Sequence, residues 1–583
     1  MMFDTSSAPG QAQPHIDFQV GVVGAGPTGL LVAAELARAG VSVVVLDRHA
    51  APDTTIKAGS INVATAEILD RRGPRPAARA AQQRFVEELT AFAVANGTPL
   101  PPMGGRSTVG ARASFPAAGH FAGLFFRPDL LDQHNPEITA HAGAGGSTMV
   151  RQSEVESLLE TRLASLGVTV ERGVELTGMD TLFDDDGVEM GKLLVTSGGV
   201  IGVGWVVGAD GGRSRVRRFA GIGFDGTDPE ITGYQAIAEL EGTEGLGRGW
   251  NHTPTGVYSL GPIPGRILTV QFTGAPDRAL RDQPVTEAEL QASIRLVTGH
   301  DVTVRALHGA ATRWTDNARQ AATYRSGRVL LAGDAAHVHS PFSGQGLNLG
   351  AGDAINLGWK LAATIDGWAP EGLLDTYTTE RHPIGAQVLD WTRAQVALMR
   401  GDDKTIQLRR VVEQDLLSNS VTTTRLVLTT SGVAQRYDLP DFDDAGVDAP
   451  QHPLLGRLIG DTPLSAGGRL ADRFHTGRFV LLDRLGGALA ATAAAWSERV
   501  VSVVETAPAA DCPDAYRATT GILIRPDGII AWATDTQQPE EGIAALEKAM
   551  NHWVGAQADA TAQPTRPIFT DMEVGGASLL SVK

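Results

Sequence analysis

The segment 328–348, RVLLAGDAAHVHSPFSGQGLN, combines residue types at a spacing that could support ligand chemistry. An apolar run, Val329–Ala332, leads into Gly333-Asp334, and a glycine-rich turn, Ser343–Gly346, precedes an apolar-periodic stretch, Leu347–Ile365, that predicts a helix. A carboxylate at a strand end beside a glycine turn at a helix N-terminus can hold a polyhydroxylated, anionic ligand. Taken alone, the segment could equally be an ordinary turn between a strand and a helix.

A second glycine-rich segment, Gly24-x-Gly26-x-x-Gly29, follows a predicted strand at Asp17–Val23 and opens a predicted helix. Its three glycines allow, in order, a tight turn, close approach of the backbone to a pyrophosphate, and close packing of helix on strand. Asp47 ends the next predicted strand, where a carboxylate can bind both hydroxyls of a ribose. Strand, helix and acid together predict dinucleotide binding, and the alternative is a structural glycine-rich turn.

A third segment, Gly208–Arg217, places Asp210 directly after the predicted strand Val203–Val207. Asp-Gly-Gly turns are common in hairpins, so this segment alone favours a structural role. A cluster of arginines favours phosphate binding instead, because guanidinium groups pair well with phosphates. The cluster consists of Arg213, Arg215, Arg217 and Arg218. For Arg215 and Arg218, a solvated helix face is the alternative interpretation.

The composition limits the classes of function. At 583 residues the chain is too long for one hydrophobic core, so we expect two or three domains. Its net charge of -17 argues against nucleic acid or an anionic membrane as a partner, and no apolar run approaches a membrane span. Residues 1–16 lack the apolar region of a signal peptide, and Cys512 is the single cysteine, which excludes an internal disulfide. We therefore expect a cytoplasmic protein, and no metal site is predicted.

In this order, the three segments resemble the single-component flavin aromatic hydroxylases, the p-hydroxybenzoate hydroxylase-like class A monooxygenases. Arg151–Glu156 resembles the family's helix start, whose glutamine contacts the flavin, and Tyr377–Pro383 resembles the helix after the third motif. The C-terminal residues resemble the thioredoxin-like domain of phenol hydroxylase-type relatives. Three stretches carry that second likeness: Gly467–Leu470, Phe479–Leu482 and Arg525–Gly528. Enzymes that tailor aromatic polyketides are the most similar subgroup.

The resemblance implies an α/β fold with a Rossmann-like FAD-binding domain of the GR2 type, a β-sheet substrate domain and a C-terminal thioredoxin-like domain. The expected FAD-binding domain comprises residues 17–85, 145–225 and 325–400. The expected substrate domain comprises 86–144 and 226–324, and the glycine-rich stretch 85–148 could be an entrance lid. Residues 401–455 would be a helical connection and linker. Residues 456–583 would be the thioredoxin-like domain, which lacks a CxxC pair and would serve in packing or in oligomer formation. The protein would be a monomer or a homodimer.

One FAD is implied, with roles carried over by position. The cofactor-binding residues would be Gly24, Gly26, Gly29, Asp47, Arg48, Gln152, Asp210, Asp334, Gly346, Leu347 and Asn348. The glycines at 24–29 would face the pyrophosphate, Asp47 the adenosine ribose, and Gln152 the ribityl or phosphate region. Asp334 would bind a ribityl hydroxyl or the pyrophosphate. Amides at Leu347 and Asn348 would stabilise negative charge on the reduced ring. Pro341 and Gly346 would be the catalytic positions on the oxygen side of the ring, with no side-chain base identified.

Many members of the family have an arginine where this chain has Lys57. A lysine lacks bidentate geometry, so a role for Lys57 in flavin motion or in binding the nicotinamide phosphate stays open beside an ordinary solvated lysine. The chain has no second GxGxxG motif in a strand–helix context, so NADPH or NADH would bind only transiently as the reductant. His337 and His339 gain no role from the resemblance and are interpreted as structural.

The implied reaction is hydroxylation of a bulky aromatic substrate of the polycyclic polyketide type, using O2 and NADPH, through a flavin C4a-hydroperoxide. Three alternatives stay open: Baeyer–Villiger-type or ring-rearranging oxygenation of a polycyclic ketone or quinone, an oxygen-independent flavin reductase or dehydrogenase, and a non-catalytic FAD or ligand-binding protein. Six side chains of the strand-rich region could contact substrate or could equally pack the sheet. They are Tyr234, Gln235, His252, Tyr258, Arg305 and Trp314.

Overall fold

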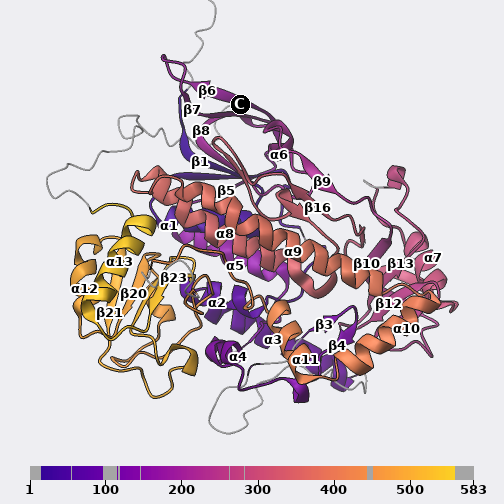
Figure 1. The fold of residues 1–583 in the computed structure, drawn as a ribbon. Helices are drawn as coiled ribbons and strands as arrows, with labels where there is room; N and C mark the ends of the chain where they lie inside the picture. Colours follow the sequence, from indigo (N-terminus) through magenta and orange to yellow (C-terminus); the bar gives the residue numbers. More distant parts are fainter. Residues whose placement is uncertain are drawn as a thin grey trace, which may run out of the picture.

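The computed structural model describes residues 15–53, 55–95, 115, 119–144, 146–261, 263–280, 283–442 and 451–557. Figure 1 shows the C-terminal residues, in yellow, as a unit at one end of the molecule and a sheet labelled β10, β12 and β13 toward the other end. The long helices α8 (Gln345–Ile365) and α9 (Thr376–Leu398) run between them. No helix in the described ranges is long and apolar enough to cross a membrane.

The first sheet brings the three glycine-rich segments together. Its main path has the order β17-β18-β8-β1-β2-β5, and β6 and β7 extend it beyond β8. The strands are β1 (Phe18–Val23), β2 (Val43–Asp47), β5 (Val170–Arg172), β6 (Leu176–Phe183), β7 (Glu189–Thr196), β8 (Gly199–Gly208), β17 (Arg325–Ser326) and β18 (Val329–Leu331). Strand β1 pairs in parallel with β2 and β8, and β8 pairs in parallel with β18. The carboxyl ends of β1, β8 and β18 therefore lie at the same edge of the sheet, where α/β proteins bind ligands.

Helices cover this sheet because its central strands are apolar on both faces. The helix α1 (Pro27–Arg38) packs against α8 and against α5 (Gln152–Ser165). Two further helices, α2 (Val63–Arg72) and α3 (Arg75–Ala95), follow β2. The helix predicted over Leu347–Ile365 begins two residues earlier, at Gln345. Within the expected lid at 85–148, residues 96–114, 116–118 and 145 lie outside the described residues.

The second sheet is antiparallel and has the order β11-β12-β13-β10-β14, with β15 paired to β10. Its strands are β10 (Thr232–Glu241), β11 (Gly249–Thr253), β12 (Gly256–Leu260), β13 (Arg266–Gln271), β14 (Thr303–Leu307) and β15 (Thr312–Trp314). Helix α7 (Glu287–Thr298) packs on β12, β13 and β14 and buries Leu290, Ile294 and Val297. A separate small sheet has the order β19-β16-β9 and is formed by β9 (Phe224–Gly226), β16 (Arg319–Ala321) and β19 (His337–Val338). The hairpin of β3 (His120–Phe121) and β4 (Leu124–Phe125) is separate.

After α9 the chain continues through α10 (Asp403–Val411) and α11 (Ser420–Thr430) into the C-terminal unit. Its sheet has the order β21-β20-β22-β23, formed by β20 (Phe479–Asp483), β21 (Val500–Val504), β22 (Gly521–Ile524) and β23 (Ile530–Thr534). Strands β20 and β21 are parallel and joined through α12 (Ala488–Ala493), whereas β22 and β23 are antiparallel and precede α13 (Pro539–Trp553). This is the thioredoxin-like arrangement that the sequence predicted, with Cys512 buried and free.

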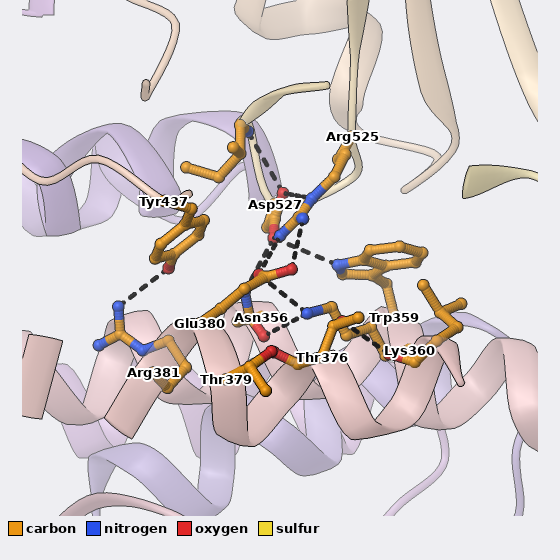
Figure 2. A network of polar contacts seen from close by, with 12 residues as sticks. Asn356, Trp359, Lys360, Thr376, Thr379, Glu380, Arg381, Tyr437, Arg525 and Asp527 are labelled. Atoms are coloured by element: carbon orange, nitrogen blue, oxygen red, sulfur yellow. Dashed lines mark hydrogen bonds and ion pairs between the residues drawn. The ribbon is translucent and has the colours of Figure 1, made fainter. Parts of the chain in front are cut away.

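A buried polar network joins this unit to the long helices (Figure 2). Arg525, from the β22–β23 turn, donates to both carboxylate oxygens of Glu380 at 2.8 and 2.7 Å. Lys360 lies 2.9 Å from the same carboxylate, and Asp527 accepts from Arg525. Asn356 on α8 donates to Glu380 at 2.7 Å. Two buried cations and two buried anions thus compensate one another at the contact between the C-terminal unit and the long helices.

Candidate cofactor and substrate site

The three strand ends open into one cavity of about 1910 Å³. Gly24, Asp210 and Asp334, each from a different glycine-rich segment, all line it. Other lining residues from the predicted set are Gly26, Asp47, Arg48, Gln152, Gln235, Trp314, Pro341, Gly346 and Leu347. The cavity therefore extends without interruption from the edge of the first sheet to the second sheet.

The turn after β1 has the geometry that a dinucleotide-binding turn needs. Gly24 has a φ of 109°, and a Cβ there would lie 2.2 Å from the carbonyl oxygen of Ala209. A Cβ on Gly29 would lie 1.9 Å from the oxygen of Gly24, so both positions require glycine for packing. A Cβ on Gly26, by contrast, would meet nothing within 4 Å. Gly26 caps the N-terminus of α1 and faces open space, where the free amides and the helix dipole attract an anion.

Asp47 connects the end of β2 to this turn. Its Oδ2 accepts from the amide of Ala25 at 2.8 Å, and its Oδ1 accepts from the amide of His49 at 2.8 Å. Each carboxylate oxygen keeps a lone pair for a further donor such as a ribose hydroxyl. Arg48, the next residue, is exposed at the cavity wall.

Asp210 has one oxygen in use and one without a partner. Its Oδ2 accepts from the amides of Arg215 at 2.6 Å and Val216 at 3.2 Å. Its Oδ1 is buried and has no hydrogen-bond partner among the described residues, so an external donor is required there. Arg213, Arg215 and Arg218 line the cavity. Arg217 was expected in the same phosphate-binding cluster, but its guanidinium is buried against the carbonyls of Ala335 and Gly212 and over the ring of Phe224.

The segment from Pro341 to the start of α8 forms another part of the wall. Because Gly344 caps α8, the amides left free by the helix start include those of Gly346 and Leu347. Asn348 does not line the cavity, and its side chain accepts from the amide of Asn62 at 2.9 Å and donates to the carbonyl of Gly344 at 2.8 Å. The side chain of Asn348 thus holds the turn, and the role of its backbone amide toward the flavin ring stays a prediction.

Buried charged residues on α8 and α9 hold the Gly333-Asp334 turn in place, and the sequence did not indicate their role. Asp353 on α8 accepts from the amide of Gly333 at 3.0 Å, and its Oδ2 lies 2.6 Å from Nε2 of His337. Arg381 on α9 donates to Asp353 at 2.8 Å. Burial alone would raise the pKa of Asp353, but His337 and Arg381 lower it to about 2. His337 is thus structural, as the sequence suggested, whereas His339 lines the cavity.

Gln152 begins α5 at the cavity, where its Nε2 donates to Glu156 at 2.9 Å. Burial raises the pKa of Glu156, so this carboxyl favours its neutral form more than a solvated glutamate does. Lys57 also lines the cavity and pairs with Asp53 at 2.8 Å. Lys57 is therefore an ion-paired residue at the cavity wall rather than an isolated solvated lysine.

The strand register of the second sheet separates the predicted substrate residues. Gly233 pairs with Trp314 and Gln235 with Thr312 and Leu268, so these residues share the face toward the cavity. Gln235 and Trp314 line the cavity, and each has a buried side-chain nitrogen without a partner among the described residues. Tyr234, one residue away, points to the other face, where its hydroxyl donates to Glu289 on α7 at 2.9 Å.

Three further residues of the predicted set do not line this cavity, which favours the packing role that the sequence left open for them. The Tyr258 hydroxyl accepts from the amide of Gly247 at 3.0 Å. Arg305 forms an exposed ion pair with Glu241 on β10. His252 does not line the cavity, and burial lowers its pKa to about 4. Neighbouring side chains of a strand alternate between the two faces of its sheet, so two consecutive residues such as Tyr234 and Gln235 cannot both face one ligand.

Sequence reasoning also missed several lining residues. Trp250 and Phe342 lie at the wall with ring centroids 6.0 Å apart, and the Phe342 ring is 5.6 Å from that of Trp314. Arg266 on β13 lines the cavity and has no ionic partner among the described residues. His120, from the β3–β4 hairpin, lies at the wall beside Trp250. Alternation along β11 and β13 could have indicated Trp250 and Arg266, but no sequence pattern pointed to His120.

Comparisons with known proteins agree with this arrangement. The family described as "FAD binding domain" matches residues 17–392, and the family "Aromatic-ring hydroxylase, C-terminal" matches residues 452–557. The 12-dehydrotetracycline 5-monooxygenase/anhydrotetracycline 6-monooxygenase of Streptomyces rimosus is 36% identical over 560 residues, 93% of this chain and 99% of that protein. The dialkyldecalin synthase of Streptomyces rugosporus is 35% identical over 542 residues, 92% of this chain and 99% of that protein.

The solved structure of the OxyS anhydrotetracycline hydroxylase from Streptomyces rimosus superposes with a TM-score of 0.74 at 35% identity, covering 93% of this chain and 100% of that one. Both sheets and the C-terminal unit therefore belong to a fold shared over nearly the whole length. The protein belongs to the family of FAD-dependent aromatic-ring hydroxylases, which are flavoprotein monooxygenases.

Proposed function

We propose that this protein uses FAD, NADPH or NADH, and O2 to hydroxylate a polycyclic aromatic substrate of the polyketide type. The observation that carries the proposal is the single cavity of about 1910 Å³ that joins the dinucleotide turn to the second sheet. Pockets for one drug-sized ligand usually measure about 300–1,000 Å³. The cavity thus has room for a dinucleotide cofactor and for a bulky second ligand beside it.

The chain's own residues suit one FAD at the edge of the first sheet. The amides at Gly26 would receive the pyrophosphate, Asp47 the adenosine ribose, and Asp334 a ribityl hydroxyl or the pyrophosphate. The buried Oδ1 of Asp210, which has no partner among the described residues, supports this assignment, because a cofactor hydroxyl or an ordered water on it would satisfy an otherwise costly carboxylate oxygen. The amides of Gly346 and Leu347 would place positive dipoles toward the ring. Bound FAD would supply the redox and oxygen-transfer chemistry.

The substrate would lie against the second sheet. Trp250, Trp314 and Phe342 offer aromatic surfaces for a fused-ring ligand. Arg266 has no ionic partner among the described residues, and burial lowers the pKa of its guanidinium. An arginine nonetheless stays protonated, so this cation favours a substrate with an acidic or carbonyl oxygen. Gln235 offers a neutral donor on the same face.

The reductant would reach the flavin only transiently, because Gly24–Gly29 is the GxGxxG that opens a helix, whereas Gly221–Gly226 has the same spacing but leads into strand β9. Asp334 and the turn at Pro341–Gly346 would orient the cofactor, while the two sheets exclude water from the reacting ring. Baeyer–Villiger-type oxygenation of a polycyclic ketone would use the same residues and yields a product with the same added oxygen.

The test is a screen of the purified, FAD-loaded protein with NADPH against polycyclic phenols, quinones and anhydrotetracycline, under ¹⁸O2. We expect faster NADPH oxidation with an accepted substrate and a product that carries one labelled oxygen atom, whose position by NMR separates ring hydroxylation from ester formation. Unchanged NADPH consumption and no labelled product across the panel would refute the proposal. Because one relative is named a dialkyldecalin synthase, an isomeric product formed without NADPH would favour ring formation instead.

A further inference from the structure

Two residues of the cavity region adopt a backbone conformation that is costly for their type. In the described part of the chain, the non-glycine residues with positive φ are Ala122, at 53°, and Ser343, at 61°. Ala122 lies in the β3–β4 hairpin and Ser343 in the turn before α8. The left-handed conformation is unfavourable for a non-glycine residue and persists where surrounding contacts enforce it.

One buried side chain contacts both of these residues. Gln395 on α9 is fully buried, and its Oε1 accepts from the amide of Ala122 at 3.0 Å. The Ser343 Oγ lies 2.7 Å from the same Oε1 and 3.0 Å from the carbonyl oxygen of His120, so its proton is donated to one of these two oxygens. Because the Ala122 amide needs an acceptor, the orientation of the Gln395 amide is fixed. Arg409 adds a bond from Nη1 to the Ala122 carbonyl at 2.7 Å.

The hairpin held in this way presents His120 to the cavity. Its Nδ1 accepts from the amide of Gly123 at 3.0 Å, so the neutral ring carries its proton on Nε2. Burial, with a smaller effect of the Arg409 charge, lowers the pKa of His120 to about 4, which keeps the ring neutral near pH 7. Trp250, with its ring centroid 5.2 Å away, packs against the imidazole. Among the described residues, Nε2 has no hydrogen-bond partner.

We propose that Gln395 is a positioning residue that fastens the His120 hairpin to the Ser343 turn, and that His120 donates from Nε2 to a carbonyl or phenol oxygen of the substrate. The proposal rests on the proposed function, because it assigns the cavity beside the second sheet to the substrate. The Ser343 turn belongs to the segment that would face the flavin ring. One glutamine thus sets the distance between the substrate-binding wall and the cofactor. Small displacements of the substrate relative to the cofactor strongly reduce the rate of oxygen transfer.

The experiment compares four variants of the FAD-loaded protein. Gln395→Leu removes the acceptor, and Gln395→Glu keeps an acceptor oxygen as the conservative rescue. His120→Phe keeps the ring but not the donor. Thr392→Val is the control, because Thr392 is equally buried on α9, and among the described residues its hydroxyl bonds only within that helix, to the carbonyls of Val388 and Leu389.

The first measurement is hydrogen exchange, which needs no substrate. In Gln395→Leu, amides of residues 119–126 should exchange about tenfold faster or more, because the Ala122 amide loses its acceptor and the contact with the Ser343 turn is lost. Gln395→Glu should restore most of the protection, and Thr392→Val should match the wild type. Equal hairpin exchange in Gln395→Leu and the wild type would overturn the positioning role. Should Gln395→Leu fail to fold, Ser343→Ala removes the hydroxyl that contacts Gln395, and hydrogen exchange of the hairpin amides is measured in that variant instead.

The second measurement is binding of anhydrotetracycline and 1,8-dihydroxyanthraquinone, followed by the change in flavin absorbance. His120→Phe should raise the Kd of the accepted probe about fivefold to tenfold at unchanged flavin content, because one neutral hydrogen bond is lost. Gln395→Leu should lower the product formed per NADPH consumed. Wild-type affinity in His120→Phe would refute the donor role. A wild-type protein that binds neither probe would count against the proposed substrate class, while hydrogen exchange would still decide the role of Gln395.

Discussion

Replacing Arg525 by methionine should strongly weaken the attachment of the C-terminal unit. Arg525 is fully buried and donates to Glu380 and to Asp527. Methionine keeps an unbranched apolar chain but removes the charge, so that Lys360 remains as the cation of the network beside two buried carboxylates. Removing one partner of a buried ion pair typically costs about 3–5 kcal/mol, because the remaining charge is uncompensated. We expect a loss in this range for Arg525→Met.

A second substitution tests whether charge balance is the cause. Arg525→Met/Glu380→Gln leaves Lys360 and Asp527 as one cation and one anion in the same space. If uncompensated charge dominates, the double variant should lose less than the sum of the two single variants by about 1 kcal/mol or more. Strict additivity would instead point to lost packing against the rings of Trp359 and Trp553, which the Arg525 guanidinium also contacts.

The assay is urea unfolding followed by tryptophan and flavin fluorescence in parallel, since a multidomain protein can unfold in more than one step. The control is Arg517→Met, because Arg517 forms an exposed ion pair with Asp514 in the same C-terminal unit. An exposed pair of this kind contributes about 0–1 kcal/mol. A loss below about 1 kcal/mol for Arg525→Met, indistinguishable from this control, would refute the reasoning.

Three further predictions follow from the site and from the first domain. Asp334→Ala should lose bound FAD, read from the ratio of flavin to protein absorbance, while circular dichroism stays native; stoichiometric flavin would contradict its role. Gln235→Leu should raise the KM of an accepted substrate and Tyr234→Phe should not, because the two side chains lie on opposite faces of β10; equal effects would contradict the register argument. Burial alone would raise the pKa of Glu35, but Arg72 and Arg38 lower it from 4.5 to about 2. The ionised Glu35 carboxylate should therefore stabilise the folded state by about 3 kcal/mol, fully above pH 4.5 and no longer toward pH 2. The difference in urea midpoint between the wild type and Glu35→Gln should accordingly narrow as the pH falls through this window.

The sequence was most informative where one short segment carries both its structure and its chemistry. Gly24–Gly29 and the Gly333-Asp334 turn were predicted at strand ends, and the parallel order of β1, β8 and β18 places them together. The second sheet was less predictable, because its region was recognised as strand-rich without a register. Tyr234 and Gln235 are consecutive, so only one could face the ligand, and which one depends on where α7 packs.

Helix α8 shows what a pattern of apolar residues conceals. Asp353, Asn356 and Lys360 follow one another at intervals of three and four residues and therefore share one face of the helix. All three are fully buried, although the sequence shows each only as a polar residue within an apolar-periodic stretch. Polar residues at buried positions need partners, which here come from segments distant in the chain. Asp353 fixes the Gly333 turn, and Asn356 and Lys360 bind the network around Glu380. One face of a helix that starts at the cofactor cavity therefore connects that cavity to the C-terminal unit.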